Sequence, residues 1–289
     1  MTDAIGFIGL GAMGGSMAAN IVKAGIEVVA YDILPERVAA LTEIGAEAAN
    51  SPKAVAASAS RTITMVETTA QTEAVIFGAE GIVQTAKSGH QIAMMSTIDP
   101  VATKRMHAEL ASKEITMVDA PVSGGTLRAA SGELSIIVGG DDDTVEGWRP
   151  YFEPMASNIF HVGQIGQGLA MKLVNNMLIQ VNTVAIAEAF ALGAKAGLDP
   201  QKMYDVVRVS TGASFALDHR VPRFLSGDFE PGGTVDISYK DQELGVPLLL
   251  ANVSQQVYQM ARAKGLSKEY GAAVIKLYEE MVGVKLGPR

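Results

Sequence analysis

The 289-residue sequence predicts an α/β protein in which a doubly wound, mostly parallel sheet precedes an all-α domain. The first observation is that short strand-like runs alternate with helical patterns up to about residue 163. The second is that strand candidates disappear after that point, where a long apolar helical pattern begins. We place the boundary at the glycine-rich segment 163–168, which gives domains 1–163 and 164–289.

The strands expected in the first domain are short runs rich in Ile, Val and Met. Strands that alternate with helices pair in parallel, because each return to the same edge of the sheet needs a crossover. The expected strands are 4–10, 26–31, 61–66, 91–96, 115–119, 134–139 and 158–162. Helical patterns between them include 100–113 and 143–155.

The second domain is expected to be built on a long central helix over residues 168–196, with Gly197 as its stop. At 1.5 Å per residue such a helix is ~43 Å long, which suits the spine of an all-α domain or an oligomer interface. Asp199 and Pro200 are residue types that begin a helix. Further helical patterns cover 247–264 and 267–282.

The composition argues against several classes of function. The net charge of −8 is spread along the chain and the basic residues are scattered, so nucleic-acid binding is not expected. The chain has no cysteine, and therefore no disulfide, thiol nucleophile or zinc–thiolate site. The four histidines lack the spacing of metal ligands, so no metal site is expected.

Neither a secretory signal nor a membrane span is expected. The N-terminus enters a strand almost at once and has no basic region before it. The longest apolar stretch, Met177–Leu198, is interrupted by polar residues and is interpreted as a buried helix. The interrupting residues are Gln180, Asn182, Glu188 and Lys195. We therefore expect a cytoplasmic protein.

Residues 5–32 contain the most informative motif. An apolar strand leads into a G-x-G-x-x-G turn at Gly9, Gly11 and Gly14, a helix follows, and a second strand ends on Asp32. The glycines permit a tight turn, a close approach of backbone amides to a pyrophosphate, and packing of the helix on the strand. This context predicts a dinucleotide-binding βαβ unit. The turn also contains Leu10, Ala12 and Met13.

Asp32 indicates which dinucleotide binds. A carboxylate at this strand end accepts hydrogen bonds from ribose hydroxyls and repels the 2′-phosphate of NADP, so NAD is favoured over NADP. The first basic residue after it is Arg37. Arg37 could hold a phosphate or lie solvated on the next helix, and we favour the second interpretation.

A second candidate site is the segment Asp119–Gly125, which follows an expected strand at the edge where open α/β sheets bind ligands. Gly124 and Gly125 leave backbone amides free to form an anion-binding nest, and Ser123 adds a hydroxyl donor. A carboxylate would fit there, although a flexible turn would have the same sequence.

The start of the long helix contains Lys172 and Asn176, which are four residues apart and share one helical face. Lys172 lies among apolar residues, so it is either a snorkelling surface lysine or a buried functional amine. Burial moves the pKa of a lysine toward the range useful for proton transfer. The pair Lys240 and Asp241 indicates little by itself.

Together these segments resemble the β-hydroxyacid dehydrogenase family, which includes 3-hydroxyisobutyrate dehydrogenase, tartronate semialdehyde reductase and L-threonate-type dehydrogenases. The family is distantly related to 6-phosphogluconate dehydrogenase. The resemblance covers nearly the whole chain, with its motifs in the family's order. They are Gly6–Gly14, Ser96–Ile98, Asp119–Gly125, Gly132–Leu134, Val138–Gly140, Gly166–Asn176 and Lys240–Asp241.

The resemblance implies an N-terminal Rossmann domain, a C-terminal all-α domain and a substrate bound between them. It implies an NAD(P)-dependent dehydrogenase that interconverts a small 3-hydroxy carboxylic acid and its semialdehyde or ketone. A homodimer or homotetramer is expected by analogy.

The resemblance also implies roles for individual residues. Lys172 would be the catalytic acid/base, and Asn176 would orient the substrate hydroxyl. The substrate carboxylate would be held by Ser123, Gly124 and Gly125, with Lys240 contacting cofactor or substrate. The cofactor would be bound by Gly9, Leu10, Gly11, Ala12, Met13, Gly14, Asp32, Met65, Val66, Ser96, Thr97, Lys240 and Asp241.

Two alternatives stay open: an imine reductase-like enzyme, in which another residue usually occupies the lysine position, and a non-catalytic NAD-binding module.

The sequence also departs from the family pattern. Gly233 stands where an aromatic residue is common, which indicates a substrate other than 3-hydroxyisobutyrate. Only three residues separate Asp241 from Gly245, where relatives have about two more helical turns, and this bears on the placement of Lys240.

Overall fold

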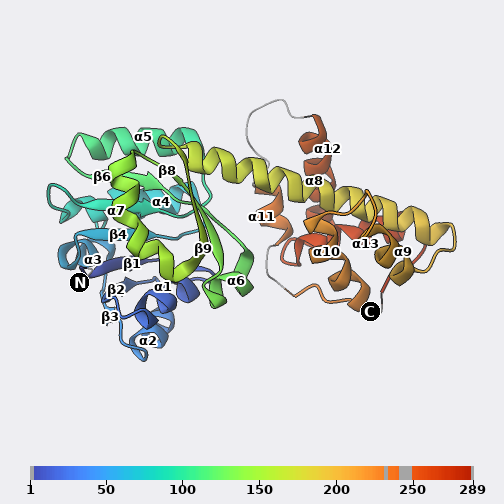
Figure 1. Cartoon of the computed structure of the whole chain (residues 1–289), viewed down its shortest axis with the longest axis horizontal. Coiled ribbons are helices and arrows are strands. Elements are labelled where there is room, and N and C mark those ends of the chain that lie inside the picture. Colours follow the sequence, from blue (N-terminus) through green and yellow to red (C-terminus); the bar gives the residue numbers. More distant parts are fainter. Residues whose placement is uncertain (1–2, 231–233, 241–248, 288–289) are drawn as a thin grey trace. The chain divides into compact units, whose positions relative to one another are not determined.

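The computed structural model describes residues 3–230, 234–240 and 249–287 (Figure 1). Contacts divide the chain into two compact units, Met1–Lys172 and Leu173–Arg289. The first unit is α/β and the second is helical. The division falls inside helix α8 (Gln167–Lys195), whose first turns belong to the first unit.

A nine-stranded sheet forms the centre of the first unit, in the order β3-β2-β1-β4-β5-β6-β8-β7, with β9 also paired to β8. The ladders from β3 to β6 are parallel, whereas β8 is antiparallel to β6 and to β7. The predicted doubly wound, mostly parallel sheet is confirmed. The strands are Ile5–Ile8 (β1), Val28–Tyr31 (β2), Glu47–Ala48 (β3), Arg61–Thr64 (β4), Gln91–Met94 (β5), Thr116–Asp119 (β6), Val122–Ser123 (β7), Leu134–Gly139 (β8) and Ala156–Gly163 (β9).

Apolar side chains of this sheet alternate between two cores, one on each face. In β2, Val28 and Ala30 enter a core shared with α1, α2 and α7, whereas Val29 enters a core shared with α3 and α5. Helices therefore cover both faces of the sheet, as the strand–helix alternation predicts. These helices are Gly14–Lys23 (α1), Pro35–Thr42 (α2), Pro52–Ser58 (α3), Thr69–Phe77 (α4), Pro100–Ala111 (α5), Gly125–Ser131 (α6) and Asp142–Phe152 (α7), with 3₁₀ turns at Ile82–Gln84 and Glu153–Met155.

The second unit packs helices around one apolar core, to which α8 contributes Val184, Ala187 and Phe190. Among its described residues there is one isolated β-bridge, Thr234 to Tyr270, and no strand. The pattern over 267–282 forms a 3₁₀ turn and a short helix instead of one long helix. The elements after α8 are Pro200–Val207 (α9), Phe215–Ser226 (α10), Val235–Lys240 (α11), Leu249–Ala263 (α12), Gly271–Val274 (3₁₀) and Ile275–Val282 (α13).

Helix α8 is long and apolar enough to cross a membrane, by length and composition only. A single helix of this kind is weak evidence for a span, because the core helix of a soluble protein has the same properties. Leu169 lies in a core of the first unit and Phe190 in the core of the second. The helix therefore behaves as a core element at both ends.

Candidate functional site

The carboxyl ends of the parallel strands lie level with one another. The register pairs Ile8 with both Tyr31 and Thr64, Thr64 with Met94, and Met94 with Asp119. The residues that follow these strands are therefore neighbours at one edge of the sheet, where open α/β sheets bind ligands. This edge brings together the glycine turn, Asp32, Met65–Val66, Ser96 and the Asp119–Gly125 segment.

The glycine turn leaves no room for side chains at two of its positions. Gly9 has φ +96°, and a Cβ there would overlap the carbonyl oxygen of Met65. A Cβ at Gly14 would overlap the carbonyl oxygen of Gly9, so helix α1 begins in contact with the turn. At Gly11, by contrast, the nearest atom to a Cβ would be Nη1 of Arg37 at 3.8 Å. The backbone at Gly11 is therefore open to a ligand.

The first turn of α1 has no side-chain cap and no acidic residue. Gly15 N donates to Gly11 O, and the positive end of the helix dipole before it is available to an anion beside Gly11. This geometry fits the pyrophosphate of a dinucleotide, and it is the geometry that the G-x-G-x-x-G spacing predicts.

Asp32 is buried behind this turn. Its Oδ2 accepts a hydrogen bond from Leu10 N at 2.6 Å, and its Oδ1 accepts one from Leu34 N at 2.9 Å. Arg37 Nη1 lies 3.5 Å from Asp32 Oδ1, with the Arg37 side chain 44% exposed. Arg37 is thus half-exposed but turned toward Asp32 and Gly11, which differs from a wholly solvated residue.

The next two strand ends are joined by a hydrogen bond. The hydroxyl of Ser96, which is buried, accepts from Val66 N at 2.9 Å. Met65 N donates to Ile8 O at 2.8 Å, so the Met65–Val66 segment is held beside the glycine turn. Thr97 follows Ser96 and is half-buried. These four residues lie at the sheet edge that also contains Gly9.

The Asp119–Gly125 segment runs from β6 through the two-residue strand β7 into α6. Gly124 has φ +139° and Gly125 has φ +70°, and a Cβ at Gly125 would meet nothing within 4 Å. Ser123 is half-buried and pairs with Ser135 of β8. The positive φ angles are typical of a nest, in which successive amides converge on an anion.

Lys172 and Asn176 are each 9% exposed and lie one turn apart on α8. A lysine buried to this extent is unusual unless it has a structural or chemical partner. Asn176 Oδ1 accepts from Asn175 Nδ2 at 3.2 Å. Lys240 ends α11, and its side chain lies outside the described part of the chain, as do Asp241 and Gly233.

One residue of the site has a role that its motif did not predict. Asp119 is fully buried, and its carboxylate accepts from Gly166 N at 2.6 Å and from Leu169 N at 2.7 Å. Burial raises the pKa of Asp119 to about 6, while the two amides and the charge of Lys104 act in the opposite direction. The sequence shows an acid at the end of an expected strand, but it does not indicate that amides at 166 and 169 are its partners.

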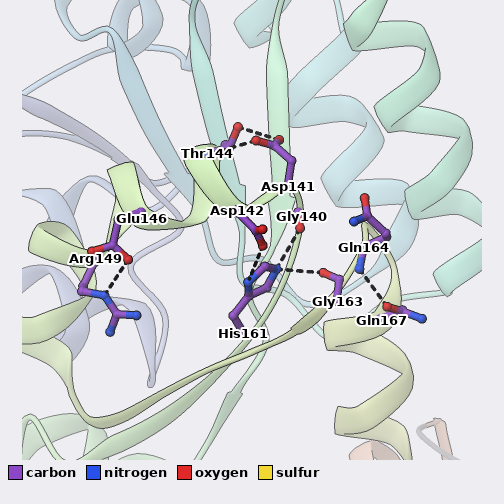
Figure 2. Close-up of polar contacts among 10 residues, drawn as sticks. All are labelled: Gly140, Asp141, Asp142, Thr144, Glu146, Arg149, His161, Gly163, Gln164 and Gln167. Carbon is purple, nitrogen blue, oxygen red and sulfur yellow. Dashed lines mark hydrogen bonds and ion pairs between the residues drawn. The ribbon is translucent and has the colours of Figure 1, made fainter.

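Figure 2 shows polar contacts around the turn between β9 and α8. His161 Nε2 lies 2.8 Å from Gly140 O and 3.1 Å from Gly163 O, and its Nδ1 lies 3.3 Å from a carboxylate oxygen of Asp142. Gln167 Oε1 accepts from Gln164 N at 2.7 Å. The turn that begins α8 is therefore fixed by several polar contacts.

Known protein families match both halves of the chain. The NAD-binding domain of 6-phosphogluconate dehydrogenase matches residues 4–163. The NAD-binding domain of NADP-dependent 3-hydroxyisobutyrate dehydrogenase matches residues 166–278.

Individual relatives match over nearly the full length. A 2-(hydroxymethyl)glutarate dehydrogenase of Eubacterium barkeri is 39% identical over 98% of this chain and 97% of its own. An L-threonate dehydrogenase of Cupriavidus necator is 35% identical over 96% and 97%. The solved structure of Mycobacterium tuberculosis 3-hydroxyisobutyrate dehydrogenase with L-serine has a TM-score of 0.87 at 33% identity, over 96% of this chain and 99% of that one.

An imine reductase from Pseudomonas sp. also shares the fold, with a TM-score of 0.58 at 19% identity, and at that identity the likeness shows the fold alone. The three relatives above, each more than 30% identical, are matched over at least 96% of this chain. The chain belongs to the β-hydroxyacid dehydrogenase family.

Proposed function

We propose that this protein is an NAD-dependent oxidoreductase that interconverts a small 3-hydroxy carboxylic acid and its semialdehyde or ketone. The observation that supports this most strongly is a buried lysine, Lys172, one helical turn before a buried Asn176. Lys172 belongs to the same unit as a dinucleotide fingerprint with an open helix end. The names of the relatives at 39% and 35% identity support the same class of substrate.

The cofactor would lie along the glycine turn, with its pyrophosphate at the N-terminus of α1 and its adenosine ribose near Asp32. Asp32 keeps lone pairs for the ribose hydroxyls, since each of its oxygens accepts one backbone hydrogen bond. Its charge opposes a 2′-phosphate, so NAD is preferred, although Arg37 at 3.5 Å weakens that preference. Met65, Val66, Ser96 and Thr97 would line the path toward the nicotinamide, which exchanges a hydride with the substrate when it is bound.

The substrate carboxylate would be held by Ser123, Gly124 and Gly125. Gly124 and Gly125 have positive φ angles, and their backbone amides would donate to the carboxylate together with the Ser123 hydroxyl. Charge-assisted hydrogen bonds of this kind fix both the position and the orientation of a carboxylate.

Lys172 would act as the acid/base. In the oxidation direction a neutral Lys172 amine takes the proton of the substrate hydroxyl. In reduction the Lys172 ammonium returns a proton to the developing alkoxide. Asn176, on the same face of α8, would orient that hydroxyl by hydrogen bonding. Proton transfer by a positioned group typically accounts for about 10²–10⁴-fold in rate.

Several finer assignments belong to the same proposal. Lys240 and Asp241 would contact cofactor or substrate from the second domain. We propose domains 1–163 for NAD binding and 164–289 for substrate binding and oligomerisation, in a cytoplasmic homodimer or homotetramer. An imine reductase-like activity is disfavoured by Lys172, and a non-catalytic module is disfavoured because both Lys172 and Asn176 are present and buried.

The proposal is tested by NADH formation at alkaline pH against a panel of 3-hydroxy acids. The panel includes 3-hydroxyisobutyrate, threonate and 2-(hydroxymethyl)glutarate, and NADP is the parallel cofactor. We expect one acid to be oxidised with NAD at least ten times more efficiently than with NADP. An absence of turnover with every acid, in protein that binds NADH, would favour the non-catalytic module. Amine-dependent oxidation would favour the imine reductase.

A further inference from the structure

The first turn of α8 is fastened to the end of β6 by one side chain. Asp119 is the last residue of β6, and its two carboxylate oxygens accept separately from Gly166 N and Leu169 N. Gly166 immediately precedes α8, and Leu169 is in its first turn. These amides are among those that a helix cannot satisfy internally. The carboxylate therefore acts as the N-terminal cap of α8 from 47 and 50 residues earlier in the chain.

The packing around this carboxylate leaves no space for a side chain at two neighbouring glycines. A Cβ at Gly139 of β8 would overlap Asp119 Oδ1. A Cβ at Gly168 would lie 2.9 Å from Asp119 Oδ2 and 2.5 Å from the carbonyl oxygen of Ile137. Both glycines are therefore needed for α8 to reach the sheet at this point. Lys172 follows Gly168 by one turn and lies on the same helical face.

Asp119 also begins the segment that leads to Ser123–Gly125. We propose that Asp119 is a positioning residue for Lys172: its carboxylate joins the first turn of α8 to the end of β6 and fixes where the Lys172 amine lies relative to the Ser123–Gly125 loop. This inference rests on the proposed function, because it assigns Asp119 a place in that reaction. Asp119 itself need not touch substrate or cofactor.

We call the Asp119 carboxylate the anchor of α8, and its charge state depends on the groups around it. Among the described residues around Asp119 are Met94 of β5, Gly139 of β8, Gly166 before α8, and Gly168 and Leu169 of α8, none of which titrates. The charge that acts on it comes from Lys104 of α5, whose stem lies against Gly166. Burial raises the pKa of Asp119 to about 6, so the anchor loses its charge in mildly acidic solution.

The test uses Asp119→Asn. This variant keeps the shape of the side chain but places an NH₂ group against one of the two amides, Gly166 N or Leu169 N. Asp199→Asn is the matched control, because Asp199 caps α9 by accepting from Lys202 N at 2.9 Å. We expect kcat to fall about 10²-fold in Asp119→Asn, as a shift of about 1 Å at a reacting group does, with the Kd for NADH within about twofold of wild type. Asp199→Asn should keep kcat. An unchanged kcat in Asp119→Asn would overturn the inference.

The pH profile separates positioning from mere stability. In the reduction direction Lys172 donates a proton, which acid solution does not oppose, so we assign a loss of kcat below about pH 6 to Asp119. Wild-type kcat should fall below this pH, and this fall should be absent in Asp119→Asn. If kcat of the variant falls at the same pH and by the same factor as in wild type, another group causes the fall and the proposal is contradicted.

Hydrogen exchange gives a readout that needs no turnover. In Asp119→Asn, the peptide 164–172 should exchange at least about tenfold faster than in wild type, while the α9 peptide is unchanged. If the variant does not fold, wild-type exchange of the same peptide, corrected for intrinsic rates, should slow as the pH falls from 6 to 4, because an opening that exposes Asp119 must release the proton that the buried carboxyl holds. Unchanged protection would overturn the anchor. A wild type with no hydroxy acid turnover but with this exchange pattern would refute the proposed function alone.

Discussion

Helices α1 and α8 both begin at the carboxyl edge of the parallel strands, and their N-termini differ in capping. We call the uncapped N-terminus of α1 the open helix end and the N-terminus of α8, which Asp119 caps, the closed helix end. Helix α1 starts at Gly14 with no side-chain cap and no acid in its first turn. Helix α8 starts beside the buried carboxylate of Asp119, which accepts from two of its amides. Both ends have the same partial positive charge. The α1 end is where we propose that the cofactor pyrophosphate binds, whereas the α8 end is capped by Asp119, which we propose places Lys172.

The largest effect is expected at the residue that α8 places. Lys172→Ala should lower kcat about 10²–10⁴-fold, because the proton acceptor is lost, while NADH binding to the α1 site is retained. Steady-state kinetics and a fluorescence titration with NADH measure the two. Lys195→Ala is the control on the same helix, since Lys195 donates to Val282 O at the other end. Near-normal turnover in Lys172→Ala would end the proposed mechanism.

The closed helix end should make stability depend on pH. The pKa of Asp119 is about 6 in the folded protein and near 3.8 when unfolded, so between these values the native state binds more protons. The contribution of Asp119 to the free energy of unfolding should therefore decrease as the pH rises from about 4 to 6, by at most about 3 kcal/mol. Burial lowers the pKa of His90 to about 4, so His90 contributes a change of opposite sign over the same range. Urea unfolding measures the net slope, which Asp119→Asn should make more positive.

Asp141 offers a contrast within the same experiment. Its pKa is lowered, chiefly by the Thr144 hydroxyl, so its contribution is present above its unfolded pKa and is lost as the pH falls below about 3.8. Asp141→Asn should leave the slope between pH 4 and 6 intact. Equal slopes in wild type and Asp119→Asn would refute the assignment to Asp119.

A carboxylate can be placed at the uncapped N-terminus of α1 by mutation. Gly11→Asp places a carboxylate where a Cβ has room, so the protein should fold and α1 should resemble α8. NADH binding should weaken by about 10²-fold, because the new charge repels the pyrophosphate from the helix end. Gly11→Asn has the same bulk without the charge and should weaken binding less. Equal losses in the two variants would show that bulk, not charge, controls access.

A smaller effect is expected at the ribose end of the same site. Asp32→Ser removes the negative charge and leaves Arg37, now 3.5 Å from that carboxylate, able to face a 2′-phosphate. The ratio of kcat/KM for NAD to that for NADP should fall about tenfold, roughly 1.4 kcal/mol. Arg37→Ala should raise the ratio. An unchanged ratio in Asp32→Ser would remove Asp32 from cofactor discrimination.

The open end could be predicted from sequence because its parts are local. A strand, three glycines at fixed spacing, a helix and an acid lie within residues 5–32, and glycine requirements follow from backbone geometry. The strand–helix alternation and the long helix, expected over 168–196 and found over 167–195, were predictable for the same reason. The strands β3 and β7 were missed, since two residues give no alternation to recognise.

The closed end could not be predicted because its contacts join distant segments. Asp119 meets amides 47 and 50 residues later, and only the fold shows that Gly139 and Gly168 leave space for its carboxylate. The approach of Arg37 to Asp32 likewise depends on how α2 packs. The roles of Lys240 and Asp241 stay predictions.

The most direct test of the proposed reaction follows the hydrogen that is transferred from the substrate carbon to NAD. The hydroxy acid that turns over best is supplied with deuterium on the carbon that bears its hydroxyl, and the NADH formed is analysed by mass spectrometry. We predict that the NADH contains the deuterium and that Lys172→Ala forms this product far more slowly while still binding NADH. NADH without deuterium, or no NADH from any 3-hydroxy acid, would contradict the account.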